Sequence, residues 1–232
     1  MGKEITLTAE DGHSFKAWRV DAQNEAKTGG GIVVLPEIFG VNDHIKDVCE
    51  RFADEGFDCI APSLYDRSSQ KGCSLGYDAQ SIAIGRKLRD EFSWQDSALD
   101  VAAAVRAFDD RGLNAGCVGY CWGGTIAFLA ATRLDGLAAA VVYYGGQIIP
   151  FKDESARCPM LMHFGERDQG IPLADVEAIR QAQPRASVHL YDADHGFNCD
   201  RRQSHEPESA ALAFRRTIDF FSDQLGRAAP AS

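Results

Sequence analysis

A cysteine in a glycine-rich turn is the residue of this sequence best suited to covalent chemistry. Cys121 lies within the hexapeptide GYCWGG (residues 119–124), which follows an apolar segment and precedes a segment of helical period. A residue at such a junction of strand and helix adopts a strained backbone conformation, and small neighbours give it room. The helix N-terminus behind the thiol would favour a thiolate and offer free N–H groups to an oxyanion. The motif predicts a nucleophilic cysteine, and the alternative is a buried cysteine packed as a small apolar residue.

An aspartate and a histidine follow Cys121 in the order that the acid and the base follow the nucleophile in α/β-hydrolases. Asp168 lies in the loop GERDQGIP and His195 in the loop DADHGFN, each directly after an apolar run that predicts a strand. Ligands bind at the carboxyl ends of the strands in open α/β sheets, so we predict a triad of Cys121, His195 and Asp168 there. Three other carboxylates remain alternative partners of His195: Glu166, Asp192 and Asp194.

The loop PEIFGVN (residues 36–42) is expected to complete the same site. In α/β-hydrolases the loop after the early strand supplies the second donor to the oxyanion. We therefore predict that the backbone N–H groups of Ile38 and Trp122 form the oxyanion hole. Glu37 is an ionisable residue in an otherwise apolar loop and is expected to face this site. The alternative for Glu37 is an exposed loop carboxylate.

The elements that must position these residues follow an alternating order of strand and helix. Two short segments around the turn signal Asp11-Gly12 predict an edge hairpin over 4–8 and 14–20. Short apolar runs predict further strands over 31–35, 57–61, 114–119, 137–145, 159–165 and 187–191. Helical periods predict helices over 44–56, over a long stretch broken near Phe92, and over about 122–133, 173–182 and 207–225.

These strands are continuously apolar, which indicates an α/β fold with a mainly parallel sheet and helices on both faces. We expect a single domain over residues 1–232, with a core over 1–225 and a C-terminal tail over 226–232. The segment 62–77 is too long for a simple connector and is expected to be a surface excursion near the site.

Composition and charge exclude several other classes of protein. The chain is 45% hydrophobic and 25% charged, within the range of globular proteins. Its net charge of −10 argues against a nucleic-acid or anionic-membrane partner. Seven cysteines without CxxC pairs, and a start that lacks the signal-peptide pattern, indicate a reducing, cytoplasmic setting. The scattered Cys and His residues do not fit zinc spacing, so we expect no metal and no organic cofactor.

With these residues placed, the chain resembles the dienelactone hydrolase family, whose best-known activity is carboxymethylenebutenolidase. The resemblance rests on seven segments along the chain: DGHSFKAW, PEIFGVN, APSLYDR, GYCWGG, VVYYGG, the loop GERDQGIP that contains Asp168, and DHGFN. It implies an α/β-hydrolase fold and hydrolysis of a lactone or ester through a thioester on Cys121, with His195 and Asp168 as partners. It also implies that Glu37 helps to activate the thiol when substrate binds.

The sequence departs from this family at the groups that would hold a substrate carboxylate. The resemblance implies two arginines, but an ungapped comparison places the first near Ile82 and the second on Cys199. Arg86 lies one helical turn after Ile82, and Arg201 lies just beyond Cys199. We expect Arg86 or Arg201 to reach the carboxylate, because arginine is long and pairs bidentately.

Two further expectations concern neighbouring residues. Tyr144, in the VVYYGG segment, is expected to contact substrate. Apart from the possible reach of Arg201 to a carboxylate, Arg201 and Arg202 are expected to form a solvated face.

Together these features predict a cytoplasmic hydrolase, monomeric or a small homo-oligomer, that acts on a small lactone or ester. The missing arginines favour a variant of this hypothesis in which the substrate is a neutral ester. A different class is a non-hydrolytic protein that binds a carbonyl ligand or senses oxidants through Cys121.

Overall fold

The computed structural model describes residues 2–22 and 30–226, and these form a sheet enclosed by helices. The strands are β1 (Lys3–Thr8), β2 (Ser14–Val20), β3 (Gly30–Leu35), β4 (Asp58–Pro62), β5 (Asn114–Tyr120), β6 (Leu137–Tyr143), β7 (Met160–Gly165) and β8 (Ser187–Tyr191). The helices are α1 (Asp43–Asp54), α2 (Ala79–Arg89), α3 (Trp94–Asp109), α4 (Trp122–Arg133), α5 (Leu173–Ala182) and α6 (Pro207–Leu225). Two short 3-10 helices are η1 (Leu64–Arg67) and η2 (Ile149–Phe151).

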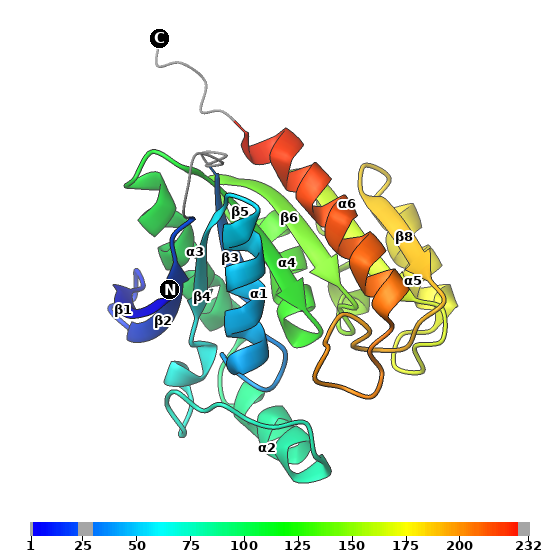
Figure 1. Cartoon of the computed structure of the whole chain (residues 1–232), viewed down its shortest axis with the longest axis horizontal. Coiled ribbons are helices and arrows are strands. Elements are labelled where there is room, and N and C mark those ends of the chain that lie inside the picture. The colour runs from blue at the N-terminus through cyan, green and yellow to red at the C-terminus, as the bar shows by residue number, and fades with distance from the viewer. Residues whose placement is uncertain (1, 23–29, 227–232) are drawn as a thin grey trace.

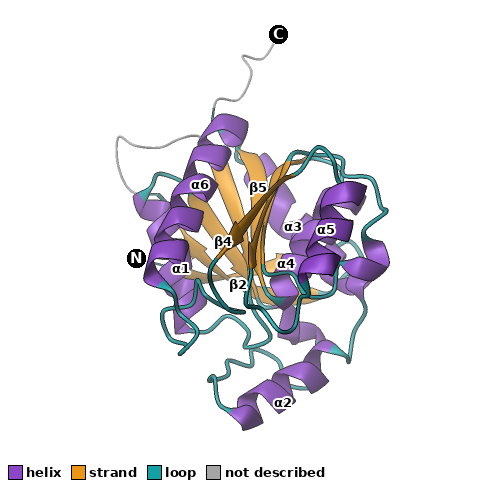
Figure 2. Ribbon diagram, turned by 90° about the vertical axis from the view of Figure 1, so that its right-hand side faces the viewer, coloured by secondary structure: helices purple, strands orange, loops and turns teal. Residues whose placement is uncertain are grey.

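The strands join in one sheet with the order β1-β2-β4-β3-β5-β6-β7-β8. β2 is antiparallel to both β1 and β4. The strands β4, β3, β5, β6, β7 and β8 run parallel to one another. The sheet twists through the molecule, with α1 and α6 on one face (Figure 1). Figure 2 shows α3, α4 and α5 on the other face, and α2 beyond the end of the sheet. The predicted α/β class with a mainly parallel sheet is confirmed.

Burial on both faces explains why the central strands are apolar throughout. Every residue of β3, β4 and β7 is buried, because helices cover the sheet on both sides. The strand β6 ends at Tyr143, two residues before the predicted end at 145. Tyr144 leaves the strand because its backbone has φ +38° and its N–H donates to the His163 carbonyl at 2.8 Å.

The break predicted near Phe92 separates α2 from α3. Ser93 caps α3: its hydroxyl accepts from the Asp96 N–H, and the Asp96 carboxylate accepts in return from the Ser93 N–H. The chain can therefore turn between the helices, which leaves α2 free to lie over the carboxyl ends of the strands.

The segment 62–77 packs against the loop that follows β3. The Leu75 N–H donates to the Phe39 carbonyl at 2.9 Å, and the Asn42 side chain donates to the Tyr77 hydroxyl at 3.0 Å. This segment therefore supports the loop that contains Glu37. Of the predicted tail over 226–232, residues 227–232 lie outside the described residues. Within 2–22 and 30–226, no helix combines the length and apolar character of a membrane span.

A buried ion pair joins η1 to α3 and offers a test of the packing. The Arg67 guanidinium binds both carboxylate oxygens of Asp100, at 2.9 and 2.7 Å, and the Asp100 side chain is 0% exposed. Burial raises the pKa of Asp100 despite this partner. Arg67→Met should therefore lower the free energy of unfolding by about 3–5 kcal/mol, because it leaves a buried carboxylate without its cation.

Urea denaturation followed by circular dichroism measures this loss. Arg157→Met is the matched control, because Arg157 pairs with Asp135 where the side chains are 50% and 92% exposed. That control should cost less than about 1 kcal/mol. Equal shifts for the two variants would contradict a structural role for the Arg67–Asp100 pair.

Candidate active site

The turn between β5 and α4 presents Cys121 in a conformation that few residues adopt. Cys121 has φ 55° and ψ −113°, and its N–H donates to the Tyr143 carbonyl at 3.0 Å. The following Gly123 lies against the end of β3, where an added Cβ would come within 2.4 Å of the Leu35 carbonyl oxygen. The glycine in the motif is thus required by this close approach, and the turn directs Cys121 toward the carboxyl end of the sheet.

Asp168 and His195 come together from the ends of β7 and β8. His195 Nδ1 lies 2.7 Å from Asp168 Oδ2, and the Asp168 side chain is 0% exposed. The other Asp168 oxygen accepts from the Gly170 N–H at 2.8 Å, which holds the carboxylate in place. Asp168 therefore fixes the orientation of the imidazole.

The alternative carboxylates make other contacts or none with the imidazole. Asp192 pairs with Arg167 at the surface, and Asp194 accepts from the backbone N–H of His195 at 3.0 Å. Glu166 is exposed. The geometry therefore favours Asp168 as the partner of the His195 ring.

His195 also interacts with Cys121, and this interaction raises the pKa of the imidazole. Burial by itself lowers the pKa of His195, but negative charge on Cys121 and the hydrogen bonds to Asp168 and Cys121 outweigh burial and raise the pKa to about 10. The surroundings of His195 therefore favour the protonated form of the imidazole beside Cys121.

The backbone donors expected at Ile38 and Trp122 lie on two segments that touch. The Gly123 N–H donates to the Pro36 carbonyl at 3.1 Å, which joins the loop after β3 to the start of α4. Among the described residues, neither the Ile38 N–H nor the Trp122 N–H has a hydrogen-bond acceptor. Both groups are therefore available to a ligand oxygen.

Glu37 is buried in this loop and has a cationic partner that the sequence analysis missed. Glu37 is 2% exposed, and Arg202 Nη1 donates to its Oε1 at 3.0 Å. The Arg202 guanidinium packs on Gly196, where an added Cβ would lie 2.3 Å from Nη1. Although burial opposes it, Glu37 and other nearby negative groups raise the pKa of Arg202.

The prediction of a solvated face at Arg201 and Arg202 is wrong for Arg202. Arg201 is 54% exposed and pairs with Asp47 of α1, so it lies on the surface, and the structure does not support its expected approach to a substrate carboxylate. The signal in the sequence for this partner was Glu37, an ionisable residue in an otherwise apolar loop. A carboxylate that is buried in such a loop requires a partner.

A cavity of about 360 Å³ opens beside Cys121. Its walls include Cys121, Asp168, His195, Trp122, Asp194, Arg86, Arg89, Gly146, Gln147, Gln169 and Gly170. Arg86 therefore lies at the cavity that contains Cys121, and its contact with a substrate carboxylate stays a prediction. Arg89, one turn further along α2, lines the same cavity and was not predicted.

Tyr144 does not line this cavity, so the expectation that it contacts substrate is not supported. Tyr144 is 0% exposed, and its ring centroid lies 5.1 Å from that of His195. It therefore packs behind the imidazole. Within residues 2–22 and 30–226, no cluster of three or more His, Cys, Asp or Glu side chains is suited to a metal ion.

The fold and the cysteine turn together define an α/β-hydrolase. The profile of the dienelactone hydrolase family matches residues 15–225, and the chain belongs to that family. It is 35% identical over 213 residues to a protein of Synechocystis sp., covering 84% of this chain and 86% of the relative. It is 30% identical over 228 residues to a carboxymethylenebutenolidase of Pseudomonas putida, covering 94% and 95%.

Comparison with solved structures agrees with this assignment. A Klebsiella pneumoniae structure named for the dienelactone hydrolases superposes with a TM-score of 0.82 at 28% identity, covering 95% of this chain and 99% of that one. The chain is thus a carboxymethylenebutenolidase-like hydrolase.

The interaction of His195 with Cys121 predicts a measurable dependence of the imidazole pKa on the sulfur. In the unmodified protein His195 should titrate near pH 10, whereas in Cys121→Ala its pKa should fall, because the main charge that raises it is gone and burial still opposes protonation. Proton NMR of the histidine rings against pH measures this shift.

The spectrum of His195→Gln identifies the resonance. If His195 titrates at the same pH with and without the Cys121 sulfur, the proposed charge interaction between them is wrong.

Proposed function

We propose that this protein hydrolyses a small lactone or ester through a thioester on Cys121. The observation that carries the proposal is the convergence of Cys121, His195 and the buried Asp168 at the wall of one cavity. A thiolate, a proton donor and a group that orients the donor are the parts that nucleophilic acyl transfer requires.

In the first step the Cys121 thiolate attacks the substrate carbonyl carbon and a C–S bond forms. The carbonyl π electrons move to oxygen, and the N–H groups of Ile38 and Trp122 stabilise the oxyanion. When the oxyanion collapses, the C–O bond to the leaving group breaks and His195 gives its proton to the leaving oxygen. The product of this step is a thioester on a now uncharged sulfur.

Formation of the thioester prepares His195 for the second step. Negative charge on Cys121 is what chiefly raises the pKa of His195, so acylation removes that charge and the imidazole becomes a base. Neutral His195 then takes a proton from water while the water oxygen attacks the thioester carbonyl. The C–S bond breaks, the acid is released, and the thiolate–imidazolium pair returns.

Glu37 is proposed to act on the thiol through Arg202. The Arg202 guanidinium donates to Glu37 and its positive charge also interacts with Cys121. Because the same cation faces two negative groups, a change in the Glu37–Arg202 contact changes the stabilisation of the thiolate. Binding of an anionic substrate near Arg202 would provide such a change.

Arg86 and Arg89 support a substrate that carries a carboxylate. Both line the cavity that contains Cys121, and both come from α2, which projects beyond the sheet (Figure 2). Arg89 pairs with Asp90 at 3.0 Å and also donates to the Gln147 side chain at 3.1 Å, whereas Arg86 has no ion-pair partner among the described residues. Arg86 is therefore the residue proposed to bind the substrate carboxylate.

Steady-state hydrolysis of a carboxylated dienelactone and of p-nitrophenyl acetate tests the proposed chemistry. Cys121→Ala should lower kcat on both substrates by about 10⁴-fold or more, because no other nucleophile lies in the cavity wall at this position. Mass spectrometry of the unmodified protein quenched during turnover should detect an acyl group on Cys121. Turnover by Cys121→Ala at the rate of the unmodified protein would overturn the mechanism.

Arg86→Ala separates the two classes of substrate. The variant should raise KM for the carboxylated lactone by about 10–100-fold, because a charge-assisted hydrogen bond is lost. It should leave KM for the neutral ester nearly unchanged. Arg201→Ala is the matched control, since Arg201 pairs with Asp47 away from the cavity. Equal effects of Arg86→Ala on both substrates would show that Arg86 does not bind the carboxylate.

A further inference from the structure

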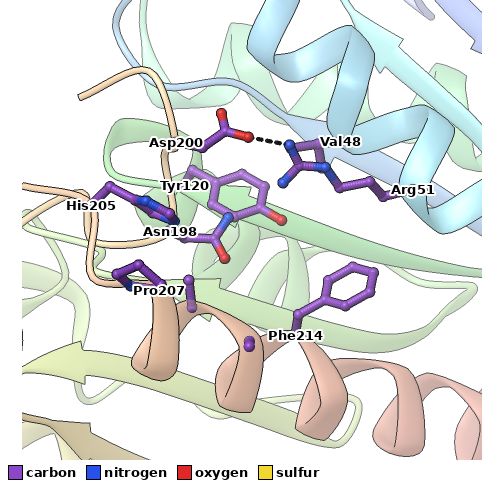
Figure 3. A pocket seen from close by; sticks show the side chains of 10 residues that line it. Val48, Arg51, Tyr120, Asn198, Asp200, His205, Pro207 and Phe214 are labelled. Carbon is purple, nitrogen blue, oxygen red and sulfur yellow. Dashed lines mark hydrogen bonds and ion pairs between the residues drawn. The ribbon is translucent and has the colours of Figure 1, made fainter.

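A second cavity, of about 280 Å³, lies on the face of the sheet that α1 and α6 cover. Its wall consists of Val48, Arg51, Tyr120, Asn198, Asp200, His205, Pro207, Ala210, Ala211 and Phe214 (Figure 3). It shares no wall residue with the cavity beside Cys121, which α2 and the loops after β6, β7 and β8 enclose. It is therefore a separate site.

Two buried polar side chains point into this second cavity without a partner. Tyr120 is 1% exposed and Asn198 is 7% exposed. Figure 3 shows the Tyr120 hydroxyl and the Asn198 carboxamide directed into the space above α6. Neither side chain makes a hydrogen bond to another described residue, and neither polar group is fully enclosed by protein, so both can pair with a molecule in the cavity. A ligand that both donates and accepts a hydrogen bond would satisfy them.

The charges on the wall are already balanced, which favours a neutral ligand. The Arg51 guanidinium pairs with the Asp200 carboxylate, and His44 Nδ1 lies 3.3 Å from the same carboxylate. Although burial opposes it, these two groups keep the pKa of Asp200 below its usual value. Arg51 therefore does not offer the uncompensated positive charge that an anion would need.

Apart from His205, the remaining wall is apolar and suits a ring. The side chains of Val48, Ala210 and Phe214 line the cavity together with the aromatic ring of Tyr120, and Figure 3 shows Phe214 on α6, the helix over which the Tyr120 hydroxyl lies. A dry cavity of about 150 Å³ is enough to bind benzene, so the volume here accommodates one substituted ring. A hydroxyl is the smallest substituent that both donates and accepts.

We propose that this cavity is a second binding site, for an uncharged single-ring phenol, distinct from the cavity that contains Cys121. The proposal does not depend on the proposed hydrolysis. Its experiment can therefore fail or succeed without regard to whether the protein cleaves esters.

Titration of the ¹⁵N-labelled Cys121→Ala protein with phenol tests the proposal by NMR. Phenol should shift the Asn198 side-chain amide and the backbone amides of 48–51 and 205–214 in a saturable manner. Toluene, which lacks the hydroxyl, should bind at least about five-fold more weakly, and benzoate should bind more weakly still. Absence of saturable shifts in these residues, or saturation only around Cys121, would overturn the proposal.

A variant that fills the cavity provides a second test of the proposal. Ala211 is exposed and lines the cavity, so Ala211→Trp should fold and should weaken phenol binding by at least about ten-fold. Ala174→Trp is the matched control, because Ala174 is an exposed alanine of α5 on the other face of the sheet. Unchanged phenol affinity in Ala211→Trp would place the ligand elsewhere and contradict the proposal.

Discussion

The close approach of the start of α4 to the carboxyl end of β3 is the constraint on which the site depends. Gly123 can donate to the Pro36 carbonyl only because it has no side chain, and that contact joins the loop after β3 to the turn that holds Cys121. The same contact holds the segment of Ile38 beside the segment of Trp122. Removal of this contact would release the loop after β3 from the turn that holds Cys121.

One loop, from His195 to His205, connects the charges around the site. His195 binds Asp168, Asp200 pairs with Arg51, and Arg202 donates to Glu37. Each partner lies on a different element, so the loop is tied to β7, α1 and the segment after β3. The Glu37 and Asp168 carboxylates are buried and stable only when paired, and these contacts hold the loop that contains His195 in place.

Much of the fold was predictable because buried strands and amphipathic helices leave periodic patterns. The bounds of α4, α5, α6 and β8 agree with the predicted ranges, and β6 ends early because Tyr144 takes a positive φ that no pattern of hydropathy reports. The positions of Cys121, Asp168 and His195 at strand ends could likewise be predicted from the sequence, because each residue follows an apolar run that forms a strand.

The sequence by itself determined the α/β class, the turn around Cys121 and the resemblance to the dienelactone hydrolases, because these depend on short local patterns. Only the tertiary structure decided which long side chains reach the site. Arg202 turns inward to Glu37 while the adjacent Arg201 turns outward to Asp47, and Arg89 joins Arg86 at the cavity. Arginine side chains have many rotamers, so their direction depends on partners distant in the chain.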